Sequence, residues 1–376
     1  MVTVNGNMMW LNLKSEGGSA AVVDVMIDGH LANSLACQLR TRNLGHKHGI
    51  ITDSNVYAYG ADLYDAMKDE GIDAYLIPPF EAGEASKSLK TCEEIIDRLD
   101  ELKFGRDSVL IGVGGGVVTD MTGVIAANYA RGIPLVLYPT TTAAQADAAI
   151  GGKTGVNSRA AKNRFGRIYQ PKLICIDVMT LITLPERAYR EGFAETIKHG
   201  IIQDADFFKY LQDNVDLILK RDLETLVYIA KQNVRIKGTV VEQDPNERGL
   251  RQILNYGHTI GHALETQLEY KGLMHGEAVS IGMMAEARMA IMMNHFSNEE
   301  LAELESLFKR FGLPTVIPAE ITEESILEKA LLDKKARAGR TRYSLPEHKG
   351  KMCDFNGAYA SEVPKEYVIA ALQQTR

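Results

Sequence analysis

The stretch from Ser108 to Asp120 reads SVLIGVGGGVVTD and joins a short apolar run directly to three glycines. The run has the length of a strand and is rich in β-branched residues, so it predicts a buried strand. A helical segment follows, and the free N–H groups at the start of a helix bind anions. The stretch therefore indicates an α/β unit with a ligand site at the glycine turn. It lacks the GxGxxG fingerprint, and a tight strand-to-helix turn without a ligand explains it equally well.

The alternation of strand and helix continues through the first half of the chain. Five further runs predict strands: AAVVDVMID (20–28), HGIITD (48–53), DAYLIPP (73–79), PLVLYPT (134–140) and LICID (173–177). Strands separated by helical segments form βαβ units and a mostly parallel sheet. From about residue 184 long amphipathic runs dominate, which is typical of a helical domain. We therefore expect an α/β domain over residues 1–183 and an α-helical domain over residues 184–376, with a site in the cleft between them.

Composition narrows the class of protein. The chain has 376 residues and a net charge of −7, which argues against general nucleic-acid binding because that needs a basic face. Its four cysteines form no CxxC pair, so a disulfide framework and a thiolate zinc site are not expected. The sequence contains neither a signal peptide pattern nor an apolar run long enough for a bilayer. We expect a cytoplasmic protein that does not bind membranes.

Two histidines four residues apart stand in NYGHTIGHALE (255–265), which places His258 and His262 on one face of a helix. HTIGH lacks the glutamate of the HExxH metalloprotease motif. A third histidine, His275, opens another helical segment, and Glu195 interrupts an apolar helical run. Two histidines and one carboxylate make a catalytic zinc-type set. Taken one at a time, these residues are better explained as capping or core histidines and a surface glutamate.

Many cations stand next to glycine or asparagine instead of in solvated Glu-Lys runs, although the protein is acidic. A buried cation is costly without a partner, and converging cations are balanced by an anionic ligand such as a phosphate or carboxylate. For a lone lysine, an extended side chain that reaches the surface is the commoner outcome. The residues concerned are Arg131, Lys153, Lys162, Lys198, Lys237, Arg251, Lys334 and Lys335.

These stretches together resemble the dehydroquinate synthase family of sugar phosphate cyclases, from about Asp53 to Lys335. The motifs that carry the resemblance are GGGVVTD, RGIP…PTT, AQADAAIGGKTGVN, KNRFG, TLPER, GFAETIK, LRQILNYGHTIGHALE, HGEAV and DKK, in the family's order and spacing. The resemblance implies a Rossmann-like NAD-binding domain over residues 1–183, a helical metal- and substrate-binding domain over residues 184–376, and a homodimer.

The resemblance also implies the site residues. Glu195, His258 and His275 match the metal ligands, for zinc or cobalt. Positions that line NAD are matched by Asp53, Glu84, Lys87, Gly115, Gly116, Val117, Asp120, Thr140, Thr141, Lys153, Lys162 and Thr183. The family's substrate-facing positions are matched by Asp147, Lys153, Lys162, Asn163, Lys198, Lys237, Arg251, Asn255, His262 and Lys335. Within this set, the catalytic positions are matched by Asp147, Lys198, Lys237, Asn255 and His262. Arg131 matches an arginine that reaches across a dimer interface toward the substrate phosphate.

From the residues alone, Asp53 caps a helix or binds a ribose hydroxyl, and Glu84 and Lys87 are solvated. The family's activity is the conversion of 3-deoxy-D-arabino-heptulosonate 7-phosphate to 3-dehydroquinate and phosphate, in the shikimate pathway. Ser158, Arg159 and Ala161 depart from the family's usual histidine, proline and glycine, which bears on the substrate. The alternatives are a cyclase for sedoheptulose 7-phosphate or glucose 6-phosphate, an amino-dehydroquinate synthase, a metal-dependent alcohol dehydrogenase of the glycerol dehydrogenase type, and a binding protein without turnover.

Overall fold

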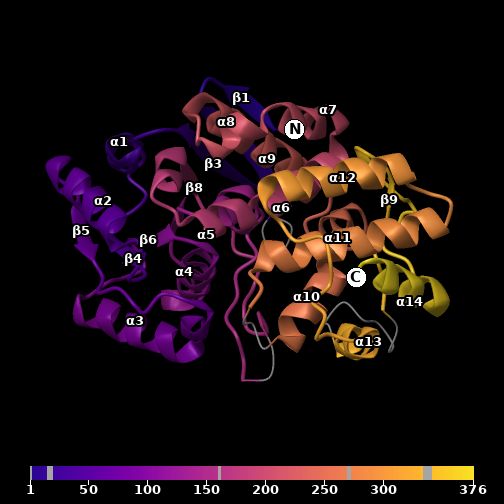
Figure 1. Cartoon of the computed structure of the whole chain (residues 1–376). Helices are drawn as coiled ribbons and strands as arrows, with labels where there is room; N and C mark the ends of the chain where they lie inside the picture. Colours follow the sequence, from indigo (N-terminus) through magenta and orange to yellow (C-terminus); the bar gives the residue numbers. More distant parts are fainter. Residues whose placement is uncertain (1, 15–19, 160–161, 269–271, 333–340) are drawn as a thin grey trace. The chain divides into compact units, whose positions relative to one another are not determined.

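The computed structural model describes residues 2–14, 20–159, 162–268, 272–332 and 341–376 (Figure 1). The contacts divide the chain into two compact units, one formed by Met1–Leu184 with Leu226–Glu242 and the other by Pro185–Thr225 with Gln243–Arg376. The domain boundary expected after residue 183 stays a prediction. The segment Leu226–Glu242 packs with the first unit, although its amphipathic pattern was grouped with the helical half.

The first unit contains an eight-stranded sheet in the order β1-β2-β3-β8-β7-β6-β4-β5. The six strands from β3 to β5 in that order pair in parallel, whereas β1, β2 and β3 pair antiparallel. The strand bounds are β1 (Thr3–Asn5), β2 (Met8–Lys14), β3 (Ala20–Asp28), β4 (Lys47–Thr52), β5 (Asp73–Leu76), β6 (Ser108–Gly114), β7 (Leu135–Pro139) and β8 (Leu173–Asp177). All six predicted strands are present, because their apolar runs are those that two layers of helix bury.

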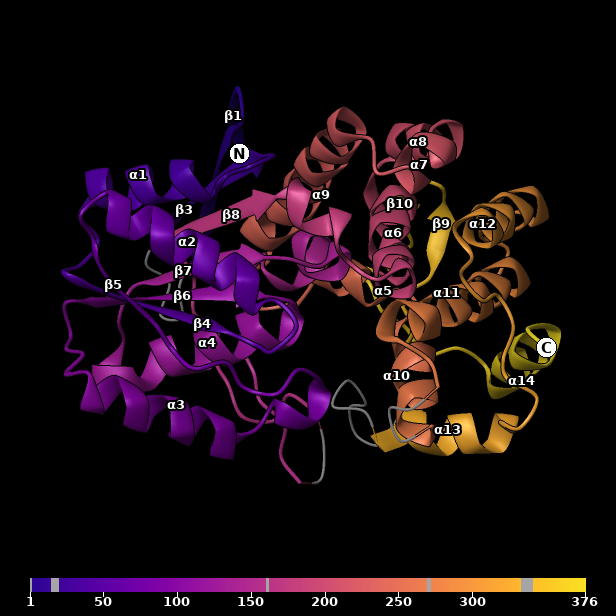
Figure 2. The same ribbon diagram turned by 60° about the vertical axis from the view of Figure 1, so that its left-hand side comes forward.

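Helices cover both faces of this sheet. Figure 2 shows α1 and α2 on one face and α3 and α4 on the other. The bounds are α1 (Ala32–Arg42), α2 (Tyr57–Asp69), α3 (Leu89–Glu101) and α4 (Gly116–Asn128). Leu35 and Leu63 pack with Ile111 and Val136 in one apolar core between α1, α2 and the sheet. The parallel strands end at one edge, where β6 passes through Gly115 into α4.

An N-terminal hairpin extends the sheet, which the sequence reading did not predict. Met9, Leu11 and Leu13 alternate along β2 and are buried. Helix α9 (Leu223–Gln243) packs beside this hairpin, and a Cβ added to Gly238 would lie 2.6 Å from Leu11 Cδ2. The hairpin therefore gives Leu226–Glu242 an apolar surface in the first unit.

The second unit is mainly helical. Its helices are α5 (Glu186–Glu191), α6 (Phe193–Gln203), α7 (Ala205–Asp213), α8 (Val215–Leu219), α10 (His258–Gln267), α11 (His275–Met292), α12 (Asn298–Phe311), α13 (Glu323–Leu332) and α14 (Lys365–Gln374). Near its C-terminal end this unit also contains the short strands β9 (Pro346–His348) and β10 (Lys351–Met352). Helices α6 and α11 are buried along most of their length. An α/β unit with a parallel sheet and a helical unit confirm the predicted fold class.

Glycines allow α10 and α11 to approach closely. A Cβ added to Gly282 of α11 would lie 2.0 Å from the carbonyl oxygen of Gly257, and one added to Gly261 would lie 3.1 Å from Val279 Cα. Gly257 itself has a φ of 78°, which favours glycine, and directly precedes α10. Because α10 and α11 begin with His258 and His275, this packing sets where the two imidazoles lie.

The described residues include no helix with the length and apolar character needed to cross a membrane. Cys37, Cys92, Cys175 and Cys353 are free thiols.

Candidate active site

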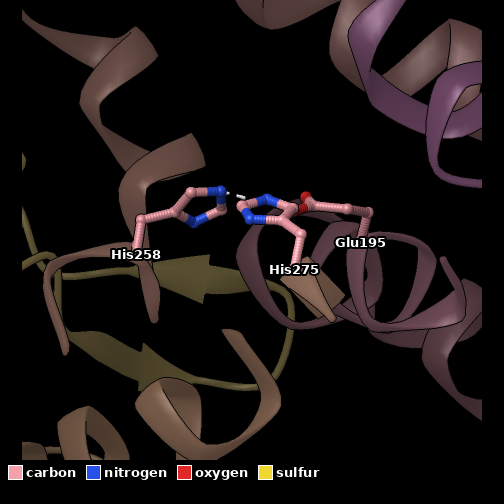
Figure 3. A group of neighbouring side chains, drawn as sticks. All are labelled: Glu195, His258 and His275. Carbon is pink, nitrogen blue, oxygen red and sulfur yellow. Dashed lines mark ion pairs between the residues drawn. The ribbon is translucent and has the colours of Figure 1, made fainter. Parts of the chain in front are cut away.

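Three side chains from three helices of the second unit meet at one point. Glu195 comes from α6, His258 from the start of α10 and His275 from the start of α11 (Figure 3). Glu195 Oε1 lies 3.3 Å from His258 Nε2 and 3.4 Å from His275 Nε2. One potential ligand atom of each residue lies within 4.8 Å of the others. The structure therefore brings the three predicted ligands together, although they are up to 80 residues apart in sequence.

The charges around this cluster keep its acid ionised. Lys198 lies one turn after Glu195 on α6, and its ammonium contacts the other carboxylate oxygen, Glu195 Oε2. Burial alone would raise the pKa of the Glu195 carboxyl, but Lys198 and His258 outweigh it and hold the pKa well below its usual range. Burial would lower the pKa of His275, yet the carboxylates of Glu265 and Glu195 raise it well above its usual value. The acid is therefore an anion that positively charged groups surround.

The donor set fits a divalent metal ion. Glu195 Oε1 is buried without a hydrogen-bond partner of good geometry among the described residues, and it faces the Nε2 atoms of both imidazoles. Two imidazole nitrogens and one carboxylate oxygen are the ligands of catalytic zinc sites, which keep a fourth position open for a substrate. A buried carboxylate is costly without a compensating charge, and a bound divalent ion would supply that charge to Glu195.

Three more predicted residues lie near these ligands in sequence. The ring of His262 is 5.4 Å from that of His258 and 6.0 Å from that of His275, centroid to centroid. Arg251 and Asn255 belong to a 3₁₀ turn, Leu250–Asn255, that leads into α10. Arg251 is only 1% exposed and donates to the Pro245 carbonyl oxygen over 2.8 Å. The turn therefore holds a buried cation beside the start of the helix that carries His258 and His262.

The predicted glycine turn lies in the first unit, where β6 ends at Gly114 and α4 begins at Gly116. A Cβ added to Gly115 would lie 3.0 Å from Thr141 Cγ2, so the turn packs tightly against the segment after β7. Thr140 Oγ1 is buried there without a hydrogen-bond partner among the described residues. An orphaned hydroxyl beside a helix N-terminus fits a bound polar ligand. Val117 follows in the first turn of α4.

The residues alone predicted that Lys87 is a solvated lysine on a loop, and this prediction is wrong. It is buried, and its ammonium lies 2.5 Å from Asp120 Oδ2 of α4. Burial raises the pKa of Asp120, and the charge of Lys87 opposes that rise. Glu84 Oε1 accepts from Asn157 Nδ2 over 2.8 Å and lies 3.9 Å from Lys162 Nζ. For Lys87 and Asp120, whose side chains are largely buried, pairing offsets the cost of removing the charges from water.

Asp53 follows β4 at the same edge of the sheet. Its Oδ1 accepts from the Asn55 N–H over 3.0 Å, so it does cap the local turn. Burial raises the pKa of its carboxyl, while the N–H groups of Asn55 and Val56 oppose the rise. Thr183 Oγ1 lies 2.6 Å from the Tyr59 hydroxyl. Both residues lie in the first unit.

Further substrate-facing candidates also occupy this unit. Lys237 of α9 lies 2.8 Å from Asp147 Oδ1 and also contacts the carbonyl oxygen of Asp147, which stands in a π-helical turn, Ala144–Ala148. Lys153 and Asn163 are exposed, and Asn163 has a φ of 51°. Arg131 is exposed with a φ of 70°. Lys335 and Ala161 lie outside the described residues.

Two carboxylates were missed by the sequence reading. Glu265 Oε2 lies 3.2 Å from His275 Nδ1, and Glu247 Oε1 accepts from Asn255 Nδ2 over 2.7 Å. A signal for Glu265 exists in the sequence, because it stands seven residues after His258 and so shares its helical face. Glu247 stands in a polar connecting segment, where no periodicity marks it.

Comparisons with known proteins show the family of this chain. A family model described as 3-dehydroquinate synthase N-terminal matches residues 78–191, and one described as 3-dehydroquinate synthase C-terminal matches residues 192–336. A protein named 3-dehydroquinate synthase from Thermodesulfovibrio yellowstonii is 41% identical over 88% of this chain and 92% of its own. The chain belongs to the 3-dehydroquinate synthase family.

Solved structures place this family member among related cyclases. A 2-deoxy-scyllo-inosose synthase in complex with carbaglucose-6-phosphate, NAD⁺ and Co²⁺ has a TM-score of 0.85 at 24% identity, and covers 100% of both chains. A 2-epi-5-epi-valiolone synthase from Streptomyces hygroscopicus with NAD⁺ and Zn²⁺ has a TM-score of 0.83 at 27% identity, over 94% of this chain and 96% of its own. The first of these likenesses shows the fold alone. The roles of the individual site residues stay predictions.

Proposed function

We propose that this family member is a 3-dehydroquinate synthase that converts 3-deoxy-D-arabino-heptulosonate 7-phosphate to 3-dehydroquinate and phosphate. Because phosphate leaves by cleavage of a carbon–oxygen bond, the enzyme is a lyase. The observation that carries the proposal is the convergence of Glu195, His258 and His275 in a chain 41% identical to a relative with that name. NAD and one divalent ion, zinc or cobalt, are the proposed cofactors.

Glu195, His258 and His275 would hold the divalent ion. When bound, such an ion polarises a substrate hydroxyl and lowers its pKa. The side chains themselves set the geometry, because each comes from a different packed helix and none is free to move alone. Lys198 keeps Glu195 ionised.

The cations and polar side chains of the site would bind the two acidic ends of the substrate. A phosphate and a carboxylate are best held by charged donors, and Lys198 and Arg251 offer such groups in the second unit. In the first unit Lys153, Lys162, Asn163 and Lys237 would have the same role. Asp147 of the first unit and Asn255 of the second would orient the sugar hydroxyls. Fixing both ends of the substrate keeps the reacting atoms aligned. His262 would carry protons to and from the ring near neutral pH.

The first unit would bind NAD, which takes up a hydride from the substrate and returns it. The N–H groups at Gly115, Gly116 and Val117 suit a pyrophosphate, since α4 starts there. Asp53 would accept from a ribose hydroxyl. The remaining proposed NAD contacts are Glu84, Lys87, Asp120, Thr140, Thr141, Lys153, Lys162 and Thr183. The buried, unpartnered Thr140 hydroxyl supports this assignment.

The test is release of inorganic phosphate from candidate sugar phosphates by the purified protein with NAD and zinc. Release from the seven-carbon acid phosphate, with formation of 3-dehydroquinate and no net NADH, is expected. A chelator should abolish release, and added zinc or cobalt should restore it. Release confined to sedoheptulose 7-phosphate or glucose 6-phosphate would overturn the proposed substrate.

The second candidate is another sugar phosphate cyclase of secondary metabolism. It is favoured by Ser158 and Arg159, which depart from the family's usual residues, and by the fold shared with the solved cyclases. Retention of Arg251, Asn255, His262 and Lys237 weighs against it, because a substrate without a carboxylate needs fewer cations. Steady accumulation of NADH with an unphosphorylated polyol would instead indicate a glycerol dehydrogenase type of enzyme.

Residues 1–183 would form the NAD-binding domain and residues 184–376 the metal- and substrate-binding domain. Arg131 would reach across a homodimer interface to the substrate phosphate of the partner, for which its exposed position is suitable. The protein would work in the cytoplasm.

A further inference from the structure

The imidazole of His275 lies between two carboxylates. Its Nε2 is 3.4 Å from Glu195 Oε1, and its Nδ1 is 3.2 Å from Glu265 Oε2. The two ring nitrogens therefore face different acids on different helices, α6 and α10. One nitrogen faces the metal cluster and the other faces away from it.

Glu265 is an unusual residue to bury. It is 5% exposed and stands on α10, seven residues after His258, so it shares a helical face with His258 and His262. Burying a carboxylate is costly unless a donor compensates it. The Nδ1–H group of His275 is such a donor, at hydrogen-bonding distance.

We infer that Glu265 is a positioning residue for the metal site: it accepts a hydrogen bond from His275 Nδ1 and so fixes the ring and its tautomer with the Nε2 lone pair facing Glu195 and His258. A histidine ligand whose other nitrogen donates to a carboxylate is a better-oriented and more basic ligand. Glu265 therefore raises the affinity of the site for a divalent ion without contacting that ion. The inference rests on the metal site of the proposed function.

The second histidine has the same arrangement with a different acceptor. His258 Nδ1 lies 3.1 Å from the backbone carbonyl oxygen of Tyr256. Both imidazoles thus have an outer acceptor that leaves Nε2 toward Glu195. The acceptor of His258 is neutral backbone, whereas that of His275 is a charged side chain, so Glu265 is the outer contact that a substitution can remove.

Two other roles for Glu265 make different predictions. His262, Glu265 and His275 offer ligand atoms within 4.8 Å of one another, so Glu265 could instead bind a second cation. It could also serve only to hold the start of α11. Glu277 also holds the start of α11, because its Oε2 accepts from the Met274 N–H over 2.7 Å. Unlike Glu265, it is not a hydrogen-bond acceptor of the His275 ring. Glu277→Gln is therefore the matched control for a purely structural role.

The experiment compares full-length wild type, Glu265→Gln, Glu265→Asp and Glu277→Gln after removal of metal. Each protein is titrated with Co²⁺ against a chelating indicator, and the visible absorption of the bound ion is recorded. We expect one ion per chain throughout, and an affinity about 10–100-fold weaker for Glu265→Gln, with an altered spectrum. Glu265→Asp should recover part of the loss, and Glu277→Gln should match wild type.

Several results would overturn the inference. Wild-type affinity and spectrum in Glu265→Gln would remove Glu265 from the site, and an equal loss in Glu277→Gln would make its role structural. Two ions in wild type, of which Glu265→Gln loses only the weaker, would make Glu265 a ligand of a second site. Tight binding of Co²⁺ by a wild-type protein that turns over no sugar phosphate would refute the proposed function but leave the inference standing, whereas no binding at all would refute both.

Discussion

Lys198 and Glu195 form an ion pair within one turn of α6, and their side chains are only 1% and 2% exposed. A buried ion pair is costly to break, because removal of one partner leaves the other charge without compensation. This pair stands beside two imidazoles, so the carboxylate is at once a partner for Lys198 and the proposed anchor of a metal ion.

Lys198→Met should destabilise the metal-free protein by about 3 kcal/mol, since the Glu195 carboxylate would stay buried without its ammonium partner. Zinc should restore part of the loss, because a bound ion stabilises the folded state and supplies positive charge to Glu195. Urea unfolding with and without zinc measures both effects. The control is Lys209→Met, which breaks an exposed pair with Asp213 and should cost less than about 1 kcal/mol. Equal losses in the two variants would contradict the role given to burial.

Gly282→Ala should lower both stability and zinc affinity. The added Cβ would lie 2.0 Å from the Gly257 carbonyl oxygen, so α10 and α11 must separate, at a cost of about 2 kcal/mol or more. His258 and His275 start these helices and would move apart. Thermal unfolding and zinc titration measure the outcome.

The control for Gly282 is Gly60→Ala in the first turn of α2. Its Cβ would meet only side-chain methyl groups, Leu76 Cδ1 and Thr52 Cγ2, at 3.2 Å, and the gain in helix propensity of roughly 1 kcal/mol or less offsets the crowding. A Gly282→Ala variant that binds zinc as wild type does would show that the close helix approach does not set the site.

His48 should make stability depend on pH. It is buried in β4 without a hydrogen-bond partner among the described residues, and burial, opposed by Asp73, lowers its pKa to about 4. The unfolded chain binds a proton near pH 6.5, whereas the folded chain does not until about pH 4. The contribution of His48 is therefore complete above about pH 6.5 and is lost as pH falls to about 4, with a total of at most about 3 kcal/mol.

His48→Val should remove this pH dependence, and urea unfolding across the same range measures it. The matched control is His30→Gln, at an exposed position of the same unit, which should leave the slope as in wild type. If the free energy of unfolding changes with pH equally in wild type and His48→Val, the pH dependence does not come from His48.

Asp53→Asn should weaken NAD binding by about tenfold or more, because a hydrogen bond to a charged acceptor contributes roughly 1.5–3 kcal/mol. Asparagine retains an oxygen for the Asn55 N–H, so the local turn should persist. Calorimetric titration with NAD measures the change. Asp62→Asn, at an exposed position of α2, is the control and should bind NAD as wild type does. Unchanged affinity in Asp53→Asn would leave Asp53 as a turn cap only.

Much of the fold follows from local patterns in the sequence. The runs at 20–28 and 173–177 match β3 and β8 in full, because mainly apolar, β-branched runs of this length are typical of strands. The N-terminal hairpin was missed even though Met9, Leu11 and Leu13 alternate in the way a half-buried strand requires. The packing of Leu226–Glu242 with the first unit could not be predicted, since an amphipathic pattern shows that a face is buried but not against which partner.

For the site, too, local sequence patterns predict some features and tertiary packing determines the others. Spacing alone places His258 and His262 on one face, but the meeting of Glu195 with His258 and His275 depends on tertiary packing that no local pattern encodes. The residue types suggested a zinc-type set, and the family resemblance singled out these three residues as its ligands. Lys87 shows the reverse, because its polar surroundings in sequence favour solvent and only the fold reveals its buried partner Asp120.

The most direct test of the central claim is an anomalous difference map, collected at the zinc absorption edge from crystals of the zinc-loaded protein. The account predicts one strong peak within bonding distance of Glu195 Oε1, His258 Nε2 and His275 Nε2, which disappears in crystals of His275→Ala that retain the fold. A map with no peak at these atoms, or with a peak that persists there in His275→Ala, would contradict it.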